Sequence, residues 1–419
     1  MKALSDKLRR VCLLLAAALL LSACFAAAAP TAAAEDPGWY GKNEWKGILD
    51  VVVGEDFTAA LREDGRVLYT GADYNGTGER IAAWSQIQRI ELQSWPTYLV
   101  GYGVDGSIRL EALFDGELYS IEPWSEEELA DWQDVEQLYL HYDSCLGLTE
   151  EGKVLALCRK EEREDFCREV SGWTQIRQLG FAMAPIVVGL REDGSLVAAQ
   201  EDDIFYDYSE LVEELRSLKN IQRLEQTDMG VFVIDGDGAL VWGMAGEGWT
   251  NIDSVYAGSD SFFALRRDGT VAVYLNSYPD DLRLREVAGW DHVAELGFDM
   301  VGFGRYVPVG LRDDGTVCTV STGYSGGAYG CWDCSGWTDV QKLYSCSDFT
   351  IGLRADGSLL VTGGEFRSAD FLDEVAQWSG IRAIFYGGDE YINHIVGLKM
   401  DGTLVAAGDN SLGQCEVGP

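Results

Sequence analysis

Histidine and basic residues are scarce in this chain. Its 419 residues include three histidines and 32 lysines and arginines, against 69 aspartates and glutamates, which gives a formal net charge of −37. So negative a surface repels a phosphate backbone, and the composition therefore argues against binding of nucleic acid. The charge either keeps an extracellular protein soluble or marks a site for a cation or a basic partner.

The chain also lacks a recognisable catalytic motif. Nucleophilic catalysis needs a base beside a serine or cysteine and a third group that orients the base. The sequence has no G-x-S-x-G motif, and its histidines are His141, His292 and His394. We therefore predict a non-catalytic protein without a cofactor. A glycan-cleaving enzyme that uses paired carboxylates is the alternative, because an acidic chain offers many such pairs.

The first 23 residues read as a signal peptide. Lys2, Lys7, Arg9 and Arg10 precede the apolar run from Val11 to Leu21. Leu21-Ser22-Ala23-Cys24 resembles a bacterial lipobox, in which Cys24 becomes the lipidated first residue of the mature chain. Residues 24–44 would then be an Ala-rich tether. Ordinary cleavage in the stretch ending at Ala34 is the alternative. Both place the mature protein outside the cytoplasm, and we expect contact with a membrane only through the lipid anchor of the first alternative.

One phrase recurs along residues 45–419. Its first half is an aromatic residue, two residues and then Ile or Val. The copies begin at Trp45, Trp84, Trp132, Trp173, Trp249, Trp290, Trp337 and Trp378, with Leu218-Lys-Asn-Ile221 as a degenerate ninth. The second half is Asp-Gly, at Asp64, Asp105, Asp193, Asp237, Asp268, Asp314, Asp356 and Asp401, with Glu151-Gly152 as the ninth.

The spacing of the phrase predicts a repeat array. Successive Asp-Gly positions lie 31 to 46 residues apart, and the shortest interval, from Asp237 to Asp268, suggests a reduced unit. Asp-Gly between apolar alternations is a hairpin signal, because the turn needs a positive φ that glycine adopts freely. We expect four strands per unit, the fourth in stretches such as Glu169-Val170 before the next Trp. The sequence thus predicts an all-β propeller of about nine units with four-stranded antiparallel blades.

The repeat resembles a known family. Val396-Gly-Leu-Lys-Met-Asp401-Gly-Thr-Leu-Val405, followed by Gly413-Gln414-Cys415, is similar to the bacterial form of the regulator-of-chromosome-condensation repeat. Val309-Gly-Leu-Arg-Asp-Asp314-Gly-Thr-Val317 matches it as well. The resemblance implies a β-propeller of seven to nine blades. Another protein with this propeller is a secreted bacterial inhibitor of β-lactamases, so the resemblance makes enzyme inhibition an alternative function. Nuclear binding to chromatin is not carried over, because the export signal and the negative charge oppose it.

The two ends of the repeat region complement each other. The chain ends in Gly413-Gln-Cys-Glu-Val417-Gly-Pro419, where other copies run into Gly-Trp, and the repeats begin near Trp45. We therefore predict that the two ends complete one shared blade and leave no open sheet edge.

The repeated Trp and Asp residues suit structural roles. A Trp at one repeat position favours a core between blades over a ring that stacks on sugars. The Asp-Gly carboxylates favour turns over calcium loops, since Asp235-Gly-Asp237 offers only two ligands. Within the repeat region, four Trp residues break the pattern and are our candidates for binding a partner at the surface: Trp95, Trp124, Trp242 and Trp332.

Eight cysteines follow the N-terminal segment: Cys145, Cys158, Cys167, Cys318, Cys331, Cys334, Cys346 and Cys415. Cys331-Trp-Asp-Cys334 is a C-x-x-C, but no second pair accompanies it, so no metal is predicted. Cys167, Cys331 and Cys415 fall near one repeat position, which favours packing thiols. A local disulfide, such as Cys318–Cys331 or Cys334–Cys346, is the alternative.

Three insertions interrupt the repeat: Glu122 to Asp131, Arg159 to Asp165 and Glu201 to Leu218. The last contains a predicted amphipathic helix over Ser209–Leu215. Insertions in repeat folds collect on one face and often carry binding, although solvated decoration is an equal alternative. We predict an exported module that binds a protein or another envelope macromolecule through this loop face. A purely structural surface protein is a further alternative.

Overall fold

A computed structural model gives the structure of the repeat region. It describes residues 45–418 apart from segments 74–75, 95–96, 114–121, 142, 184–185, 202–206, 228, 244–247, 258–260, 276–281, 301–305, 321–333, 347–348, 364–368 and 388–392. The predicted signal peptide, the tether and Cys24 lie outside the described residues. Among the described residues, no helix is both long and apolar enough to span a membrane.

Nine antiparallel sheets, each of three strands, follow one another along the described chain. We number the repeat units 1 to 9 by these sheets. Units 1 to 3 hold β1 (Ile48–Val53), β2 (Phe57–Arg62), β3 (Val67–Gly71), β4 (Ile87–Ser94), β5 (Thr97–Gly103), β6 (Ile108–Ala112), β7 (Val135–Leu140), β8 (Ser144–Thr149) and β9 (Val154–Cys158).

The other six sheets continue the same order. Units 4 to 6 hold β10 (Ile176–Met183), β11 (Ile186–Arg191), β12 (Leu196–Gln200), β13 (Ile221–Thr227), β14 (Gly230–Asp235), β15 (Leu240–Trp242), β16 (Ile252–Ala257), β17 (Ser261–Arg266) and β18 (Val271–Leu275). Units 7 to 9 hold β19 (Val293–Met300), β20 (Tyr306–Arg312), β21 (Val317–Thr319), β22 (Val340–Ser345), β23 (Phe349–Arg354), β24 (Leu359–Gly363), β25 (Ile381–Tyr386), β26 (His394–Lys399) and β27 (Leu404–Gly408).

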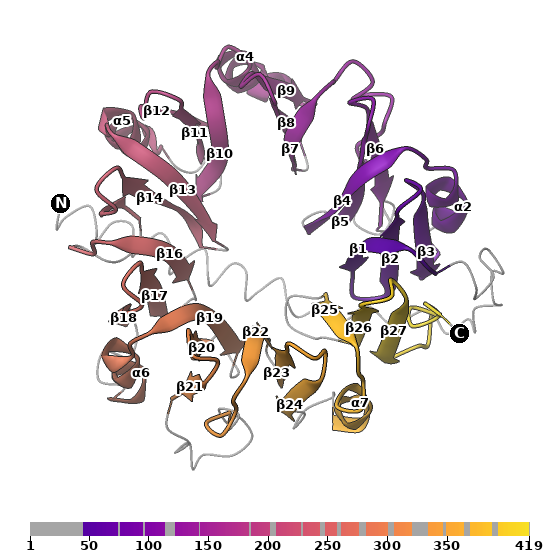
Figure 1. Ribbon diagram of the computed structural model, residues 1–419. Helices are drawn as coiled ribbons and strands as arrows, with labels where there is room; N and C mark the ends of the chain where they lie inside the picture. The colour runs from indigo at the N-terminus through magenta and orange to yellow at the C-terminus, as the bar shows by residue number, and fades with distance from the viewer. Residues whose placement is uncertain are drawn as a thin grey trace.

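The sheets stand around a propeller-like ring, with the first strand of each sheet toward the centre and the third toward the rim (Figure 1). Every unit matches one copy of the repeat, and the predicted all-β repeat architecture is confirmed. The short interval from Asp237 to Asp268 runs from the turn of unit 5 to the turn of unit 6. Both units have a sheet, but β15, the third strand of unit 5, has only three residues.

The predicted fourth strand is not found in the described sheets. At Glu169-Val170, where a strand was expected, the chain forms helix α4 (Glu164–Ser171). Helices also follow the third strand in other units: α2 (Thr77–Ala82), α5 (Ser209–Ser217), α6 (Leu282–Glu286) and α7 (Ala369–Val375), with the short 3-10 helices η1 (Glu161–Arg163) and η2 (Val287–Gly289). Each of these five α-helices packs on the outer strand of its unit and lies at the rim (Figure 1).

The prediction failed at Glu169-Val170 because the local spacing is helical. Phe166 and Val170 stand four residues apart, so both side chains point to one side of a helix and are buried. The predicted helix over Ser209–Leu215 is confirmed as α5, in which Val212 and Leu215 are buried three residues apart.

A left-handed residue precedes the first strand of every unit. This residue comes directly before the repeated Ile or Val and has a φ between 55° and 67° at Gly47, Gln86, Asp134, Gln175, Asn220, Asn251, His292, Asp339 and Gly380. Glycine, Asn, Asp and His tolerate this region better than most residues. The kink lets the following amide donate to the Asp-Gly turn of the preceding unit, as Ile176 does to the Gly152 carbonyl at 2.9 Å.

Nine hydrophobic clusters form the core, and each joins two neighbouring sheets. The middle strands are buried on both faces, as in β2 and β14, because each lies between two such clusters. The repeated Trp and Ile residues belong to these clusters, so the predicted core role of the Trp residues is confirmed. A single three-stranded sheet could not bury both of its faces alone, and the ring supplies the partners.

Each repeated Trp lies over a small residue of the next middle strand. In six units this residue is glycine, and an added Cβ would sit only 2.7 to 3.1 Å from ring carbons of the Trp: Gly101, Gly147, Gly189, Gly310, Gly352 and Gly397. Ala60 and Ala264 take the place in units 1 and 6, where they share clusters with Trp45 and Trp249. In unit 5 both partners change together, because Leu218 replaces the Trp and Val233 the glycine.

The last unit packs against the first. Trp45, Ile48 and Ala60 of unit 1 share one cluster with Val396, Leu404 and Val417 of the last unit and its tail. The Ile48 amide donates to the Gly402 carbonyl at 3.1 Å, in the same way as between consecutive units. The two ends therefore meet as predicted, but each keeps its own three-stranded sheet and they share no blade.

A buried histidine lies at this junction. His394 of β26 contacts Thr58 of β2 through Nε2 at 2.9 Å, and the Thr58 hydroxyl donates to the Gln414 carbonyl at 2.9 Å. His394 is 1% exposed, and its Nδ1 has no hydrogen-bond partner among the described residues. Burial lowers the pKa of His394 from 6.5 to about 4, against a smaller opposing effect of the Asp409 carboxylate.

We expect Gly352→Val to destabilise the ring by about 2 kcal/mol, because the new side chain must displace the Trp337 ring. Trp337→Leu alone should also destabilise it, by leaving a cavity. The double variant reproduces the Leu–Val pair of unit 5 and should cost clearly less than the sum of the two single changes. Urea denaturation of the four proteins measures this coupling, and strictly additive costs would contradict the packing described.

Acid should weaken the junction through His394. Its pKa is lower in the folded than in the unfolded chain, so its contribution to stability is present above pH 6.5 and is lost as the pH falls toward 4. Relative to His394→Gln, the wild type should lose about 3 kcal/mol of unfolding free energy between pH 7 and pH 4. Denaturant titrations of both proteins at several pH values test this. Parallel pH profiles would show that His394 does not titrate in this range.

Candidate functional site

Two of the four Trp residues proposed as surface contacts are buried in the structure. Trp124 is 4% and Trp242 is 7% exposed, so the expectation that they lie on the surface is wrong. Trp242 packs in the cluster between units 4 and 5. Trp95 and Trp332 lie outside the described residues, and their partner-binding role stays a prediction.

The Asp-Gly carboxylates serve their own turns. In units 2, 4, 6, 7, 8 and 9 the Asp accepts hydrogen bonds from the hydroxyl and the amide of the Ser or Thr two residues later, as Asp105 does from Ser107. These bonds, the hydroxyl first, lower the pKa of Asp105. One oxygen of each carboxylate, Oδ1, is thus used by the turn, in agreement with the predicted structural role.

The three histidines lie in different units and are not brought together. His292 is the left-handed residue that begins unit 7, and its Nδ1 lies 3.3 Å from a carboxylate oxygen of Asp313. His394 lies at the junction of units 9 and 1. His141 follows β7, and its backbone carbonyl accepts a hydrogen bond from Trp124.

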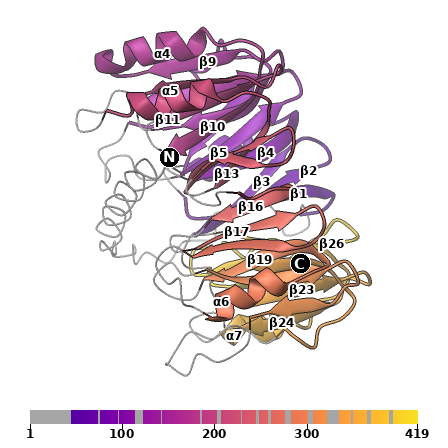
Figure 2. The same ribbon diagram turned by 90° about the vertical axis from the view of Figure 1, so that its left-hand side faces the viewer.

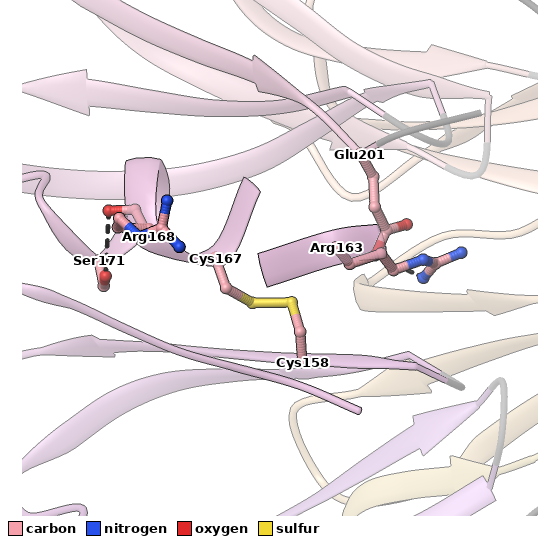
Figure 3. The surroundings of a disulfide bond; sticks show 6 residues. All are labelled: Cys158, Arg163, Cys167, Arg168, Ser171 and Glu201. Carbon is pink, nitrogen blue, oxygen red and sulfur yellow. Dashed lines mark hydrogen bonds and ion pairs between the residues drawn. A yellow bond between two sulfur atoms is a disulfide. The ribbon is translucent and has the colours of Figure 1, made fainter. Parts of the chain in front are cut away.

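A disulfide joins Cys158 at the end of β9 to Cys167 in α4 (Figure 3). The expectation that Cys167 is a free packing thiol is therefore wrong, and this pair is not among the disulfides considered from the sequence. Cys318 is a buried thiol that donates to the Gly310 carbonyl, so it does not pair with Cys331, which lies outside the described residues. Cys346 likewise donates from Sγ to the Phe349 carbonyl. The signal for the true pair was a strand end followed by a helix, with the two cysteines nine positions apart in the sequence.

The three insertions lie side by side along the rim of units 2, 3 and 4. We name the insertion strip as residues 122–131, 159–171 and 207–217, together with Glu201. Figure 2 shows α4 and α5 as neighbours at one end of the molecule. Ion pairs and hydrogen bonds join all three parts across the unit boundaries, so they form one continuous surface.

Arg159 joins the second part of the strip to the first. Its guanidinium donates to both carboxylate oxygens of Glu128 at 2.9 Å and to the Pro123 carbonyl at 2.8 Å. It also lies over the Trp124 ring, 3.9 Å from the ring centroid, which adds a cation–π contact. Burial opposes ionisation of Glu128, but the bonds from Arg159 and Ser125 prevail and lower its pKa.

Trp124 is therefore an anchor of the strip rather than an exposed contact. Its backbone amide donates to the Tyr98 hydroxyl at 2.8 Å, and its indole Nε1 donates to the His141 carbonyl at 2.7 Å. Both of its N–H donors are thus bonded within the protein, and the face of its ring contacts the Arg159 guanidinium.

Two further arginines join the second part to the third. Arg163 donates to Glu201 at 2.6 Å, and Glu201 is only 7% exposed. Arg216 of α5 donates to Glu169 of α4 at 2.6 Å and to the Ala198 carbonyl of β12 at 2.9 Å. The Arg163–Glu201 pair is largely shielded from water, whereas the Arg216–Glu169 pair is exposed and is expected to contribute less to stability.

The strip presents mainly carboxylates to solvent. Its arginines and Lys160 all pair with carboxylates of the protein: Arg159 with Glu128, Lys160 with Asp143, Arg163 with Glu201, Arg168 with Asp165 and Arg216 with Glu169. Exposed acidic side chains surround these pairs, namely Glu127, Asp131, Glu161, Glu162 and Glu164. The insertion strip is therefore an ordered surface that carries a net negative charge. Within the described part of the chain, no group of three or more metal-ligating side chains could hold a metal ion.

No family model and no curated protein matches this chain. Several solved structures are similar to it. The computationally designed protein Ika8 is 12% identical, with a TM-score of 0.38, and the match covers 87% of this chain and 97% of Ika8. Yeast RCC1 (Prp20), solved bound to Kap60, is 15% identical, with a TM-score of 0.28 over 91% of this chain and 74% of that one.

The CRINKLY WD40 ectodomain of the Arabidopsis thaliana receptor kinase ACR4 is 11% identical, with a TM-score of 0.31 over 76% of this chain and 95% of that one. These TM-scores lie below 0.5. The fold assignment therefore rests on the sheets and interfaces of this chain, and the resemblance to the chromosome-condensation repeat stays an expectation from the sequence.

Arg159→Ala should loosen the strip. The change removes a bidentate ion pair and a cation–π contact, and we expect a loss of about 1–2 kcal/mol. Arg168→Ala is the matched control, because Arg168 is exposed and pairs only with Asp165 of its own helix. Its cost should stay below about 0.5 kcal/mol. Thermal unfolding of the two variants measures the difference, and equal effects would contradict the anchoring role of Arg159.

Proposed function

We propose that this chain is an exported nine-bladed propeller that binds a protein or another envelope macromolecule through the insertion strip. The observation that carries the proposal is the joining of the three insertions across units 2 to 4 by Arg159, Arg163 and Arg216. The repeat core needs none of these three arginines, because they lie outside the hydrophobic clusters between the sheets. Helices α4 and α5 themselves have counterparts in α2, α6 and α7 and do contribute buried side chains to those clusters. An ordered surface that the core does not require is typical of a binding site on a repeat scaffold.

Order in the free protein favours binding. A surface already held by ion pairs loses little conformational entropy when a partner docks on it. The Trp124–Arg159 stack and the buried Arg163–Glu201 pair fix the strip before any partner arrives. The exposed carboxylates then select a partner with a basic face and speed its approach at low ionic strength.

Export and anchoring rest on the N-terminal sequence. The basic start, the apolar run and Leu21-Ser22-Ala23-Cys24 support a lipoprotein whose propeller lies outside the cytoplasm. We also propose that the protein is not an enzyme, because its histidines lie in separate units and its repeated carboxylates are used by turns.

Charge removal on the strip tests the proposal. Glu127→Gln, Glu161→Gln and Glu162→Gln together should weaken capture of the partner from the native envelope, by about tenfold or more at low salt. The matched control carries Glu63→Gln, Glu192→Gln and Asp313→Asn, which change the charge equally at exposed turns away from the strip. The control should capture the partner as the wild type does.

Quantitative affinity capture with the mature domain, at low and at physiological salt, gives the readout. Equal capture by both triple variants would refute binding through the strip. Capture that does not depend on salt in any of the three proteins would refute the electrostatic part of the proposal.

A further inference from the structure

The disulfide closes a short loop in the second part of the insertion strip, and this loop contacts the first and the third parts. Cys158 and Cys167 are nine residues apart, with their Cα atoms 6.2 Å from each other. The segment between them carries Arg159, which holds the first part of the strip, and Arg163, which holds Glu201 of the third part. Figure 3 shows the bond between the end of β9 and α4, with Arg163 and Glu201 beside it.

Apart from the disulfide, two buried side chains hold helix α4 on the core. It has only eight residues, and an isolated helix of this length is not stable in water. Its buried side chains are Phe166, Cys167 and Val170, so one of its three inward contacts is itself half of the disulfide. Beyond the disulfide, the exposed end of α4 is tied to the third part of the strip by Glu169, which accepts from Arg216.

We propose that the disulfide Cys158–Cys167 is a redox-controlled lock on the insertion strip. In the oxidised state α4 is docked and the strip is continuous from unit 2 to unit 4. Reduction frees α4 and loosens the contacts of Arg159, Arg163 and Glu169, while the nine-sheet core stays folded. The role in partner binding rests on the proposed function, but the lock itself does not.

The reduction follows thiol–disulfide exchange. A dithiol reductant attacks the sulfur of Cys158, which is the more exposed of the two, and the Cys167 thiolate leaves. The second thiol of the reductant then resolves the mixed disulfide and takes Cys158 as its leaving group. Overall the protein gains two electrons and two protons and has two thiols, and the dithiol becomes a disulfide.

Hydrogen exchange followed by mass spectrometry tests the lock. The mature domain is compared with and without dithiothreitol, together with Cys158→Ser/Cys167→Ser and the control Cys415→Ser. Reduction or the double change should speed exchange of amides in residues 159–171 by about ten- to a hundredfold. Residues 122–131 and 207–217 should follow to a smaller extent, and the strands of units 6 to 9 should not change.

Unchanged exchange in residues 159–171 would overturn the proposal, and so would faster exchange throughout the ring, which would make the bond a general staple. Peptide mapping that finds both cysteines reduced in the untreated exported protein would overturn it as well. Exchange is measured without a partner, so it is independent of the proposed function. Loosening of the strip that leaves capture of the partner unchanged would refute binding through the strip and leave the lock standing.

Discussion

Packing between neighbouring sheets is the interaction on which the whole structure depends. Each sheet has three strands and two apolar faces, and it can bury them only against the sheets on either side. The cluster of Trp45, Ile48 and Val417 shows that this requirement extends to the two ends, where no chain connection enforces it. Loss of one interface therefore exposes apolar surface on two units, and the ring is expected to be more cooperative than an open array.

The repeat phrase encodes three local devices that set this packing. The left-handed residue before each first strand turns the chain so that the next amide reaches the preceding Asp-Gly turn. The Asp carboxylate holds that turn by accepting from the Ser or Thr that follows it. The small residue of the middle strand admits the Trp ring, and unit 5 shows the rule by its exception, since Leu218 there faces Val233.

The sequence was most informative where the pattern repeats. The strands and turns of all nine units and the meeting of Trp45 with the Val417 tail follow from copies that could be compared with one another. The helix at Glu164–Ser171 was missed because the expectation of a fourth strand came from the architecture, although the spacing of Phe166 and Val170 indicated a helix. The burial of Trp124 could not be predicted from the sequence, because its hydrogen-bond partners Tyr98 and His141 are 26 and 17 residues away.

The candidate site was the least predictable part for the same reason. The insertions were visible as departures from the repeat, but the contacts that join them involve pairs such as Arg159 with Glu128 and Arg163 with Glu201. Such pairs depend on how neighbouring units are rotated about the ring, which no single repeat copy specifies. The cysteines posed a similar problem, since eight of them allow many pairings and only the docking of α4 on β9 selects Cys158 and Cys167.

Closure between the last and the first unit is the central claim, and the amide of Ile48 reports on it directly. In the structure this amide donates to the Gly402 carbonyl of the last unit, as the amides of Ile176 and Ile252 donate to the units that precede them. Site-resolved hydrogen exchange should find all three amides protected to a similar degree. Exchange of Ile48 at the rate of an open chain, with Ile176 and Ile252 still protected, would contradict the account.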